Sequence, residues 1–143
     1  MPGSRDAIAA LVHLYAERLD AGDLEGVAAL FANATYGAAG GPVRTGAAAV
    51  LSAIRRTLVL HDGVPRTKHV ITNLDITTDD AAGTATARSS FTVLQATPAL
   101  PLQAVLAGRY DDHFRCVRGG WQFTERRIHL ELVGDVSQHA RGL

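Results

Sequence analysis

The chain has 143 residues, and 47% of them are hydrophobic, which is typical of one globular domain that buries its core without disulfides or a structural metal. Fourteen Lys and Arg balance fourteen Asp and Glu, so no net charge draws the protein to nucleic acid or to an anionic membrane. The single cysteine, Cys116, cannot form an internal disulfide, and the sequence carries no signal peptide and no apolar run of membrane-spanning length. We therefore expect residues 1–143 to form one cytoplasmic domain that needs no cofactor and binds a neutral or weakly charged small molecule.

The first third of the chain has the apolar spacing of α-helices. Apolar residues recur every three or four positions from Ile8 to Leu19, a pattern that predicts a helix ending near Gly22. A second, shorter helix should lead to a short extended stretch at residues 34–37. The glycine-rich loop that follows, residues 37–46, has no phosphate-loop sequence and is expected to form a mobile lid or a turn before an alanine-rich third helix. The expected helix ranges are 4–22, 23–33 and 47–58, with Ser4, Asp23 and Thr45 as N-caps.

From Arg66 onward the apolar residues alternate with a period of two, which indicates β-strands. The connections at residues 79–83 and at Gly119-Gly120 are too short for parallel crossovers, so the strands are expected to be antiparallel. Helices followed by a strand meander indicate an α+β fold, and strands this long must curl. We predict a cone-shaped α+β barrel, in which three helices pack on a strongly curved, mainly antiparallel sheet that encloses a pocket. The expected strands span residues 66–78, 84–96, 103–118 and 120–132.

Alternation along each strand predicts which side chains face the pocket. The first strand is apolar on both faces, so a β-bulge is expected there. Because the predicted phases place Asp112 and Arg127 on neighbouring strands, a buried structural ion pair is the favoured interpretation of these two residues. The side chains predicted to face inward are His69, Asn73, Ser89, Phe91, Tyr110, Asp112, Phe114, Trp121, Phe123, Glu125, Arg127 and His129.

His69 is the leading candidate for a catalytic residue, because histidine exchanges protons near neutral pH and this one lies within a strand that faces the pocket. Tyr15 lies on the buried stripe of the first helix, and Asp20 lies at the end of the same stripe, which turns its carboxylate toward the sheet. A carboxylate at a helix C-terminus needs a donor, and His69 can supply one. Such a pair fixes the tautomer of the imidazole and raises its basicity. Tyr15 and Tyr110 are equally explained as core aromatics, and Tyr36 either lines the pocket mouth or caps a short strand.

The chain resembles the SnoaL-like branch of the nuclear-transport-factor-2-like superfamily over nearly its whole length. The resemblance implies a cone-shaped pocket and a homodimer packed through the outer face of the sheet. Because the superfamily contains dehydratases, isomerases, polyketide cyclases, epoxide hydrolases and non-enzymatic binding proteins, the resemblance implies a fold rather than one reaction. It rests on the order of elements and on diffuse motifs, namely Tyr15-Ala16-Glu17-Arg18-Leu19-Asp20-Ala21-Gly22-Asp23, Ala29-Leu30-Phe31-Ala32, Lys68-His69-Val70-Ile71-Thr72-Asn73, Gly108-Arg109-Tyr110 and Gly120-Trp121.

Among enzymes of this superfamily, the pattern is most similar to that of scytalone dehydratase. There an Asp and His pair is the catalytic base and tyrosines hydrogen-bond the substrate carbonyl, and Asp20 and His69 match the pair by their position in the motifs. Three differences from scytalone dehydratase indicate that this chain has another substrate: Leu19 replaces a tyrosine, Ser89 replaces a second pocket histidine, and Tyr110 replaces a pocket asparagine. The resemblance implies proton abstraction next to a carbonyl, or general acid catalysis with Tyr110 as the acid or electrophile.

Three functions remain open on the sequence. The first is a cofactor-independent lyase, isomerase or cyclase that acts on a small, mostly apolar carbonyl or hydroxyl compound, such as an aromatic or polyketide-like molecule. The second is an epoxide-type hydrolase in which Asp20, Arg127 and Asp112 hold a water molecule. The third is a non-catalytic module that binds an apolar ligand or forms a dimer. No cluster of Cys and His residues has the spacing of metal ligands.

Overall fold

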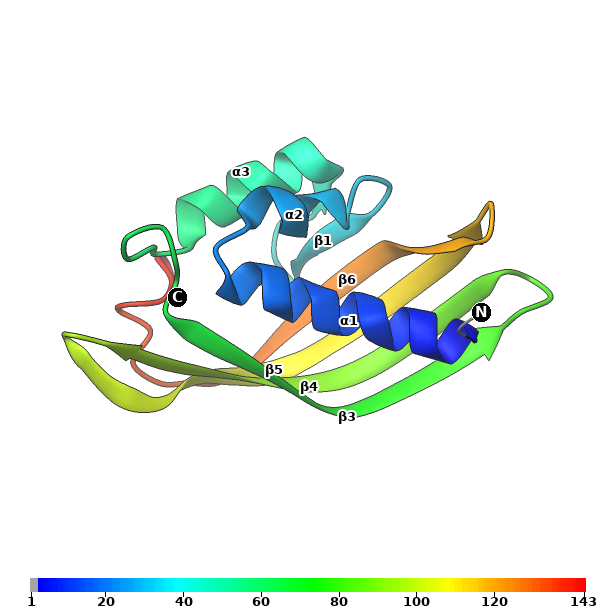
Figure 1. Cartoon of the computed structure of the whole chain (residues 1–143). Helices are drawn as coiled ribbons and strands as arrows, with labels where there is room; N and C mark the ends of the chain where they lie inside the picture. Colours follow the sequence, from blue (N-terminus) through cyan, green and yellow to red (C-terminus); the bar gives the residue numbers. More distant parts are fainter. Residues whose placement is uncertain (1–2) are drawn as a thin grey trace.

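The computed structural model describes residues 3–143 and places three helices on one face of a single curved sheet (Figure 1). The predicted α+β fold is confirmed, and residues 1 and 2 of the predicted domain lie outside the described part of the chain. None of the helices within residues 3–143 is long and apolar enough to cross a bilayer. The elements are α1 (Ser4–Asp20), α2 (Leu24–Ala29), β1 (Thr35–Ala38), β2 (Arg44–Thr45), α3 (Ala47–Thr57), β3 (Thr67–Asp79), β4 (Thr84–Thr97), β5 (Leu100–Val117) and β6 (Gly120–Val133).

The predicted helix caps are correct in one case of three. Asp23 caps α2, because its Oδ1 accepts a hydrogen bond of 2.9 Å from the backbone N–H of Gly26. The other two predicted caps are wrong, since Ser4 is already the first helical residue of α1 and Thr45 belongs to β2. Gly46 leads into α3 instead, with a φ of 85° that a residue without a Cβ adopts at little cost.

Helix α1 crosses the concave face of the sheet (Figure 1). Its buried side chains recur at spacings of three and four residues, as expected for one apolar stripe packed on a sheet. The end of this stripe brings the last residue of α1 beside the start of β3. The buried residues of the helix are Ile8, Val12, Tyr15, Ala16 and Leu19.

The six strands are ordered β2-β1-β6-β5-β4-β3. Strands β3 to β6 form the predicted antiparallel meander, whereas β1 runs parallel to β6 and makes the sheet mixed. The glycine-rich loop turns back as a hairpin at the sheet edge, where Thr35 of β1 pairs with Thr45 of β2. Because β2 and β3 are opposite edges, the curved sheet stays open instead of closing into the predicted barrel, and helices cover its concave face (Figure 1).

A β-bulge interrupts β3, as its two apolar faces predicted. The register against β4 shifts between Thr72 and Asp75, and Asn73 within the shift has a φ of 52°. His69 faces the interior before the bulge, and Ile76 is buried after it. Asn73 itself is exposed. Its predicted place in the pocket is therefore wrong, because the bulge turns it out of the inward phase.

A second bulge, in β6, reverses the phase of the last strand. The register of β5 against β6 shifts so that Thr124 is the extra residue. Phe123, which precedes it, is buried as predicted, and Arg126, which follows it, is fully buried. The predicted inward orientation is therefore wrong for three residues, which instead make ion pairs on the convex face: Glu125, Arg127 and His129.

Candidate active site

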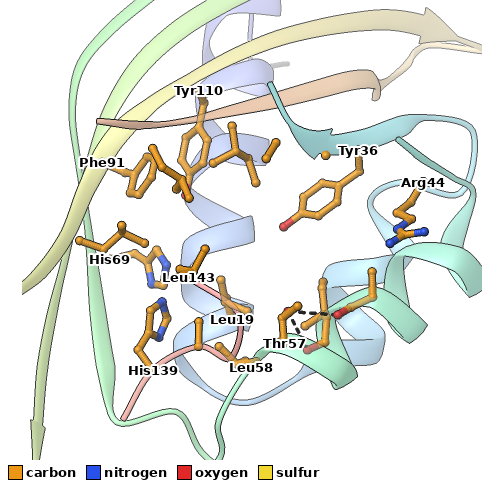
Figure 2. A pocket seen from close by; sticks show the side chains of 18 of the residues that line it. Leu19, Tyr36, Arg44, Thr57, Leu58, His69, Phe91, Tyr110, His139 and Leu143 are labelled. Atoms are coloured by element: carbon orange, nitrogen blue, oxygen red, sulfur yellow. Dashed lines mark hydrogen bonds between the residues drawn. The ribbon is translucent and has the colours of Figure 1, made fainter. Parts of the chain in front are cut away.

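A cavity of about 260 Å³ lies between the concave face of the sheet, the end of α1, α3 and the C-terminal segment, residues 134–143. Most of its wall is aliphatic or aromatic. Figure 2 shows two imidazoles, His69 and His139, beside each other on one wall and Tyr36 across the cavity from them. The cavity thus offers a few polar groups inside an apolar volume of ligand size, which is the usual character of a small-molecule site. Its apolar wall includes Leu19, Ile54, Leu58, Phe91, Leu106 and Ile128.

Asp20 and His69 are in contact at this wall. Asp20 is the last residue of α1, and His69 is the third residue of β3. His69 Nδ1 lies 2.6 Å from Asp20 Oδ1, and the backbone N–H of His69 donates to Asp20 Oδ2 at 2.8 Å. Thr67 Oγ1 donates a further hydrogen bond of 2.9 Å to Asp20 Oδ1. One carboxylate therefore fixes both the backbone and the ring of His69.

The charge of Asp20 determines the tautomer of His69. Burial raises the pKa of Asp20, but the hydrogen bonds from His69 and Thr67 and the nearby imidazole outweigh burial and bring the pKa below its usual value. An ionised carboxylate only accepts hydrogen bonds, so Nδ1 carries the hydrogen of the neutral ring and Nε2 keeps its lone pair. His69 Nε2 makes no hydrogen bond to any residue from 3 to 143, and the ring lines the cavity. The site therefore presents an oriented imidazole base to an apolar volume.

Three tyrosines supply hydroxyl groups to the same cavity. The hydroxyls of Tyr15, from α1, and Tyr36, from β1, lie 2.7 Å apart. The ring of Tyr110 stacks on Phe91 with 4.5 Å between centroids. Burial raises the pKa of Tyr15, Tyr36 and Tyr110. All three phenols are therefore neutral near pH 7. Because the hydroxyls of Tyr15 and Tyr36 share one hydrogen bond, one of these two, together with Tyr110, keeps a hydrogen to donate.

A buried arginine stands behind the tyrosines. Arg126 Nε and Nη2 each donate a hydrogen bond of 2.8 Å to the carboxylate of Asp112, and both side chains are 0% exposed. The guanidinium carbon lies 3.7 Å from the ring centroid of Tyr110 and 4.3 Å from that of Tyr15. The predicted ion pair of Asp112 exists, but its partner is Arg126 and not Arg127, because the bulge in β6 exchanges their faces. Neither charge lines the cavity, so the pair supports the aromatic wall from behind.

Five of the residues predicted for the pocket line this cavity: Tyr15, Tyr36, His69, Phe91 and Tyr110. Phe114 faces inward as predicted but packs on Phe123, 4.7 Å between centroids, in the aromatic core that fills the other end of the concave face. Ser89 is also buried away from the cavity. Because Arg127 is on the convex face, the Asp20, Arg127 and Asp112 set expected of an epoxide hydrolase is not assembled. Asp20 does not line the cavity itself but contacts His69, which does. The other predicted residues that do not line the cavity are Asn73, Ser89, Asp112, Phe114, Trp121 and Arg127.

Three basic residues that line the cavity were not predicted from the sequence: Arg44, His139 and Arg141. Arg44 lies in the glycine-rich loop, and the other two follow β6 in a segment without periodicity, so no pattern signals their position. His139 is the more informative, because burial, with a smaller contribution from His69, lowers its pKa to about 4. No group of three or more His, Cys, Asp or Glu residues within 3–143 is arranged to hold a metal ion.

Comparison with known families decides the relationship of the chain. The model of the SnoaL-like domain matches residues 3–127. The chain belongs to the SnoaL-like domain family. Its helices on a curved, open sheet match solved nuclear-transport-factor-2-like structures, as the sequence resemblance implied. A comparison of this SnoaL-like domain with curated protein sequences gives no match.

Solved structures share the fold along most of their length. Rv3472, a protein of unknown function from Mycobacterium tuberculosis, is 29% identical, and the match covers 92% of this chain and 79% of that chain with a TM-score of 0.72. A candidate scytalone dehydratase from Novosphingobium aromaticivorans is 25% identical, with 92% and 86% covered and a TM-score of 0.74. ActVI-ORFA from Streptomyces coelicolor is 16% identical, with 90% and 98% covered and a TM-score of 0.75, and this likeness shows the fold alone.

Proposed function

We propose that this SnoaL-like domain is a cofactor-independent acid–base enzyme, a lyase, isomerase or cyclase, that acts on a small apolar carbonyl or hydroxyl compound. The observation that carries the proposal is the hydrogen bond of 2.6 Å between Asp20 and His69 at the wall of an apolar cavity. A carboxylate behind an imidazole that faces a ligand volume is the arrangement required for general base catalysis. The likeness to a candidate scytalone dehydratase at 25% identity supports the same class of reaction.

In the proposed reaction, His69 Nε2 removes a proton from the carbon next to a carbonyl group. The electron pair of that C–H bond forms a C=C bond, and the π pair of the carbonyl group moves to its oxygen, which gives an enolate. Asp20 stabilises the imidazolium that forms, through the hydrogen bond at Nδ1. A phenol of Tyr36 or Tyr110 donates a hydrogen bond to the oxygen that becomes negative. In an elimination, the enolate oxygen re-forms the carbonyl group and the C=C pair forms a new double bond to the β-carbon, while the C–O bond there breaks and the hydroxyl group leaves as water with the proton from His69. In an isomerisation, the proton from His69 goes instead to another carbon of the enolate system.

The cavity supports one class of substrate over others. Its volume of about 260 Å³ and its largely aliphatic and aromatic wall suit a compact ring system rather than a polar or extended molecule. No Asp or Glu side chain from residues 3–143 lines the cavity, and Asp20, which contacts His69, already accepts three hydrogen bonds from Thr67 and His69 and is unsuited to bind a cationic ligand. A neutral compound with one or two oxygen atoms fits best.

Proton abstraction can be tested on a simple carbonyl compound, 2-tetralone, by following the exchange of its α-hydrogens in D₂O by NMR. We expect the wild-type protein to accelerate exchange, and His69→Ala and Asp20→Asn to lower the rate about 100-fold or more, the usual contribution of a positioned base. His113→Ala is the matched control, because its side chain is 55% exposed on the convex face. Equal rates for the wild type and His69→Ala refute the proposal, and saturable binding of 2-tetralone without exchange favours a non-catalytic binding module.

We also propose that the protein forms a homodimer through the convex face of the sheet. Polar groups on that face are paired with one another, since Arg109 lies 3.4 Å from Glu131 and 3.3 Å from Asp111, and His129 lies 2.8 Å from Asp111. Sedimentation equilibrium is expected to give twice the chain mass of 15.1 kDa. A monomer at concentrations of tens of micromolar contradicts the dimer without affecting the proposed chemistry.

A further inference from the structure

The C-terminal segment, residues 134–143, forms one wall of the cavity and is fixed at His139 and at Arg141 by backbone hydrogen bonds to residues 57–59. The backbone N–H of Val59 donates to the carbonyl oxygen of His139 at 2.8 Å. The backbone N–H of Arg141 donates to the carbonyl oxygen of Thr57 at 2.7 Å. In Figure 1 this red segment runs from β6 back to the end of α3. His139 therefore holds its position through backbone hydrogen bonds that do not involve its ring.

The ring of His139 is buried beside His69, and its nitrogens make no hydrogen bonds to residues 3–143. The residue is 5% exposed, and the two ring centroids lie 6.2 Å apart (Figure 2). Nδ1 of His139 is completely buried and makes no hydrogen bond within the described chain. A buried polar ring without partners costs stability, which an aliphatic side chain of similar size avoids. The presence of a histidine at this position is better explained by a ligand that forms a hydrogen bond with the other ring nitrogen, Nε2, at the cavity wall.

The chemistry of the two imidazoles is complementary. A completely buried N–H without an acceptor is less favourable than a buried nitrogen lone pair, so the hydrogen of the His139 ring is expected on Nε2. Burial lowers the pKa of His139 to about 4, and the ring is neutral near pH 7. His69, by contrast, has its hydrogen on Nδ1 toward Asp20. One wall thus offers a lone pair at His69 and an N–H donor at His139.

We propose that His139 contacts the ligand directly and that its Nε2–H donates a hydrogen bond to an oxygen atom of the molecule that His69 deprotonates. The inference rests on the proposed function for the role of His69, but the contact itself depends only on the cavity and the two rings. With 6.2 Å between the ring centroids, the oxygen belongs on, or next to, the carbon that loses its proton. The ligand class is therefore an enolisable ketone, or a compound that carries a hydroxyl group beside the acidic carbon.

The contact can be tested with 2-naphthol, which combines an apolar ring system with one hydroxyl group. His139→Leu removes the donor, whereas His139→Gln places an amide N–H near the position of Nε2 and is the matched control. We expect His139→Leu to weaken binding about tenfold or more, the equivalent of one hydrogen bond in an apolar site, and His139→Gln to stay within about threefold of the wild type. In the wild type, the ¹⁵Nε2 resonance of His139 should move as 2-naphthol saturates the site.

Equal affinity of His139→Leu and the wild type overturns the inference, as does equal loss of affinity in the Leu and Gln variants. A His139 Nε2 resonance that does not respond, or a wild-type protein that does not bind 2-naphthol saturably, overturns it as well. If a variant does not fold, the NMR titration of the wild type decides alone. Because binding is measured without turnover, failure of the exchange assay with His69→Ala leaves this result unaffected, and the two proposals fail separately.

Discussion

Lowering the pH from 7.5 to 5 should destabilise the protein through one side chain, His139. Burial lowers its pKa to about 4, against 6.5 for an unperturbed histidine. Between these two values the unfolded chain binds a proton at this residue and the folded chain does not, so stability falls as the pH falls below 6.5. For these pKa values the loss of unfolding free energy is about 2 kcal/mol at pH 5.

The groups that face His139 do not obscure this effect. Asp20 has a pKa below 3.8, so the stability that it contributes is present throughout this range and is lost only at lower pH. His69 and Arg141 also line the cavity, and both remain in the matched variant, so their contributions cancel in a comparison.

Urea denaturation of the wild type and of His139→Gln at pH 7.5, 6 and 5 provides the assay. The wild type should lose about 2 kcal/mol more than the variant between the highest and the lowest pH, because glutamine does not titrate. The variant can be more or less stable at pH 7.5 without affecting this difference. Parallel pH dependence of the two proteins means that His139 titrates normally, and the reasoning about its burial is then wrong.

Three further predictions concern packing and can be measured by urea denaturation at pH 7.5. Arg126→Met leaves the Asp112 carboxyl group buried without its partner, so we expect the free energy of unfolding to fall by about 3–5 kcal/mol. The double variant with Asp112→Leu should recover part of this loss. A double variant less stable than Arg126→Met alone contradicts the prediction. Gly108→Ala places a Cβ against the carbonyl oxygen of His129 in β6 and should lower the free energy of unfolding by about 2 kcal/mol or more. A variant as stable as the wild type would show that β5 and β6 are less closely packed at this point. Tyr36→Phe removes the hydrogen bond of 2.7 Å to the hydroxyl of Tyr15 and should lower the free energy of unfolding by about 1 kcal/mol. An unchanged free energy of unfolding contradicts this hydrogen bond.

The sequence predicts those parts of the fold where the hydrophobic period runs without interruption. From Ala85 to Val93 in β4 and from Leu106 to Phe114 in β5 the inward residues alternate without interruption, and Phe91 and Tyr110 reach the cavity as expected. Asp20 and His69 are 49 positions apart. The apolar stripe of α1 predicts the direction of Asp20, but the strand of His69 is apolar on both faces, so their pairing rests also on the need of a carboxylate at a helix C-terminus for a donor. Periodicity is a reliable guide when each face of an element has one environment.

The sequence fails where one residue changes the phase. In β6 the run Phe123-Thr124-Glu125-Arg126-Arg127 is polar on both faces after Phe123, so hydrophobicity does not distinguish Arg126 from Arg127 as the buried residue. The bulge at Thr124, which depends on the pairing of β6 with β5, places Arg126 inside and Arg127 outside, and the sequence gives no sign of it. The position of His139 could not be predicted for a different reason, since it lies in an irregular segment that is held by hydrogen bonds to residues 57–59.

The central claim is that Asp20 orients His69 so that Nε2 is a free base at the cavity wall. Nitrogen-15 NMR of the His69 ring, recorded above the pH range in which the ring titrates, tests it most directly. We predict a hydrogen on Nδ1 and a bare Nε2 in the wild type, and loss of this preference in Asp20→Asn, whose amide can donate to Nδ1. A wild-type ring that carries its hydrogen on Nε2, or a tautomer unchanged by Asp20→Asn, contradicts the claim.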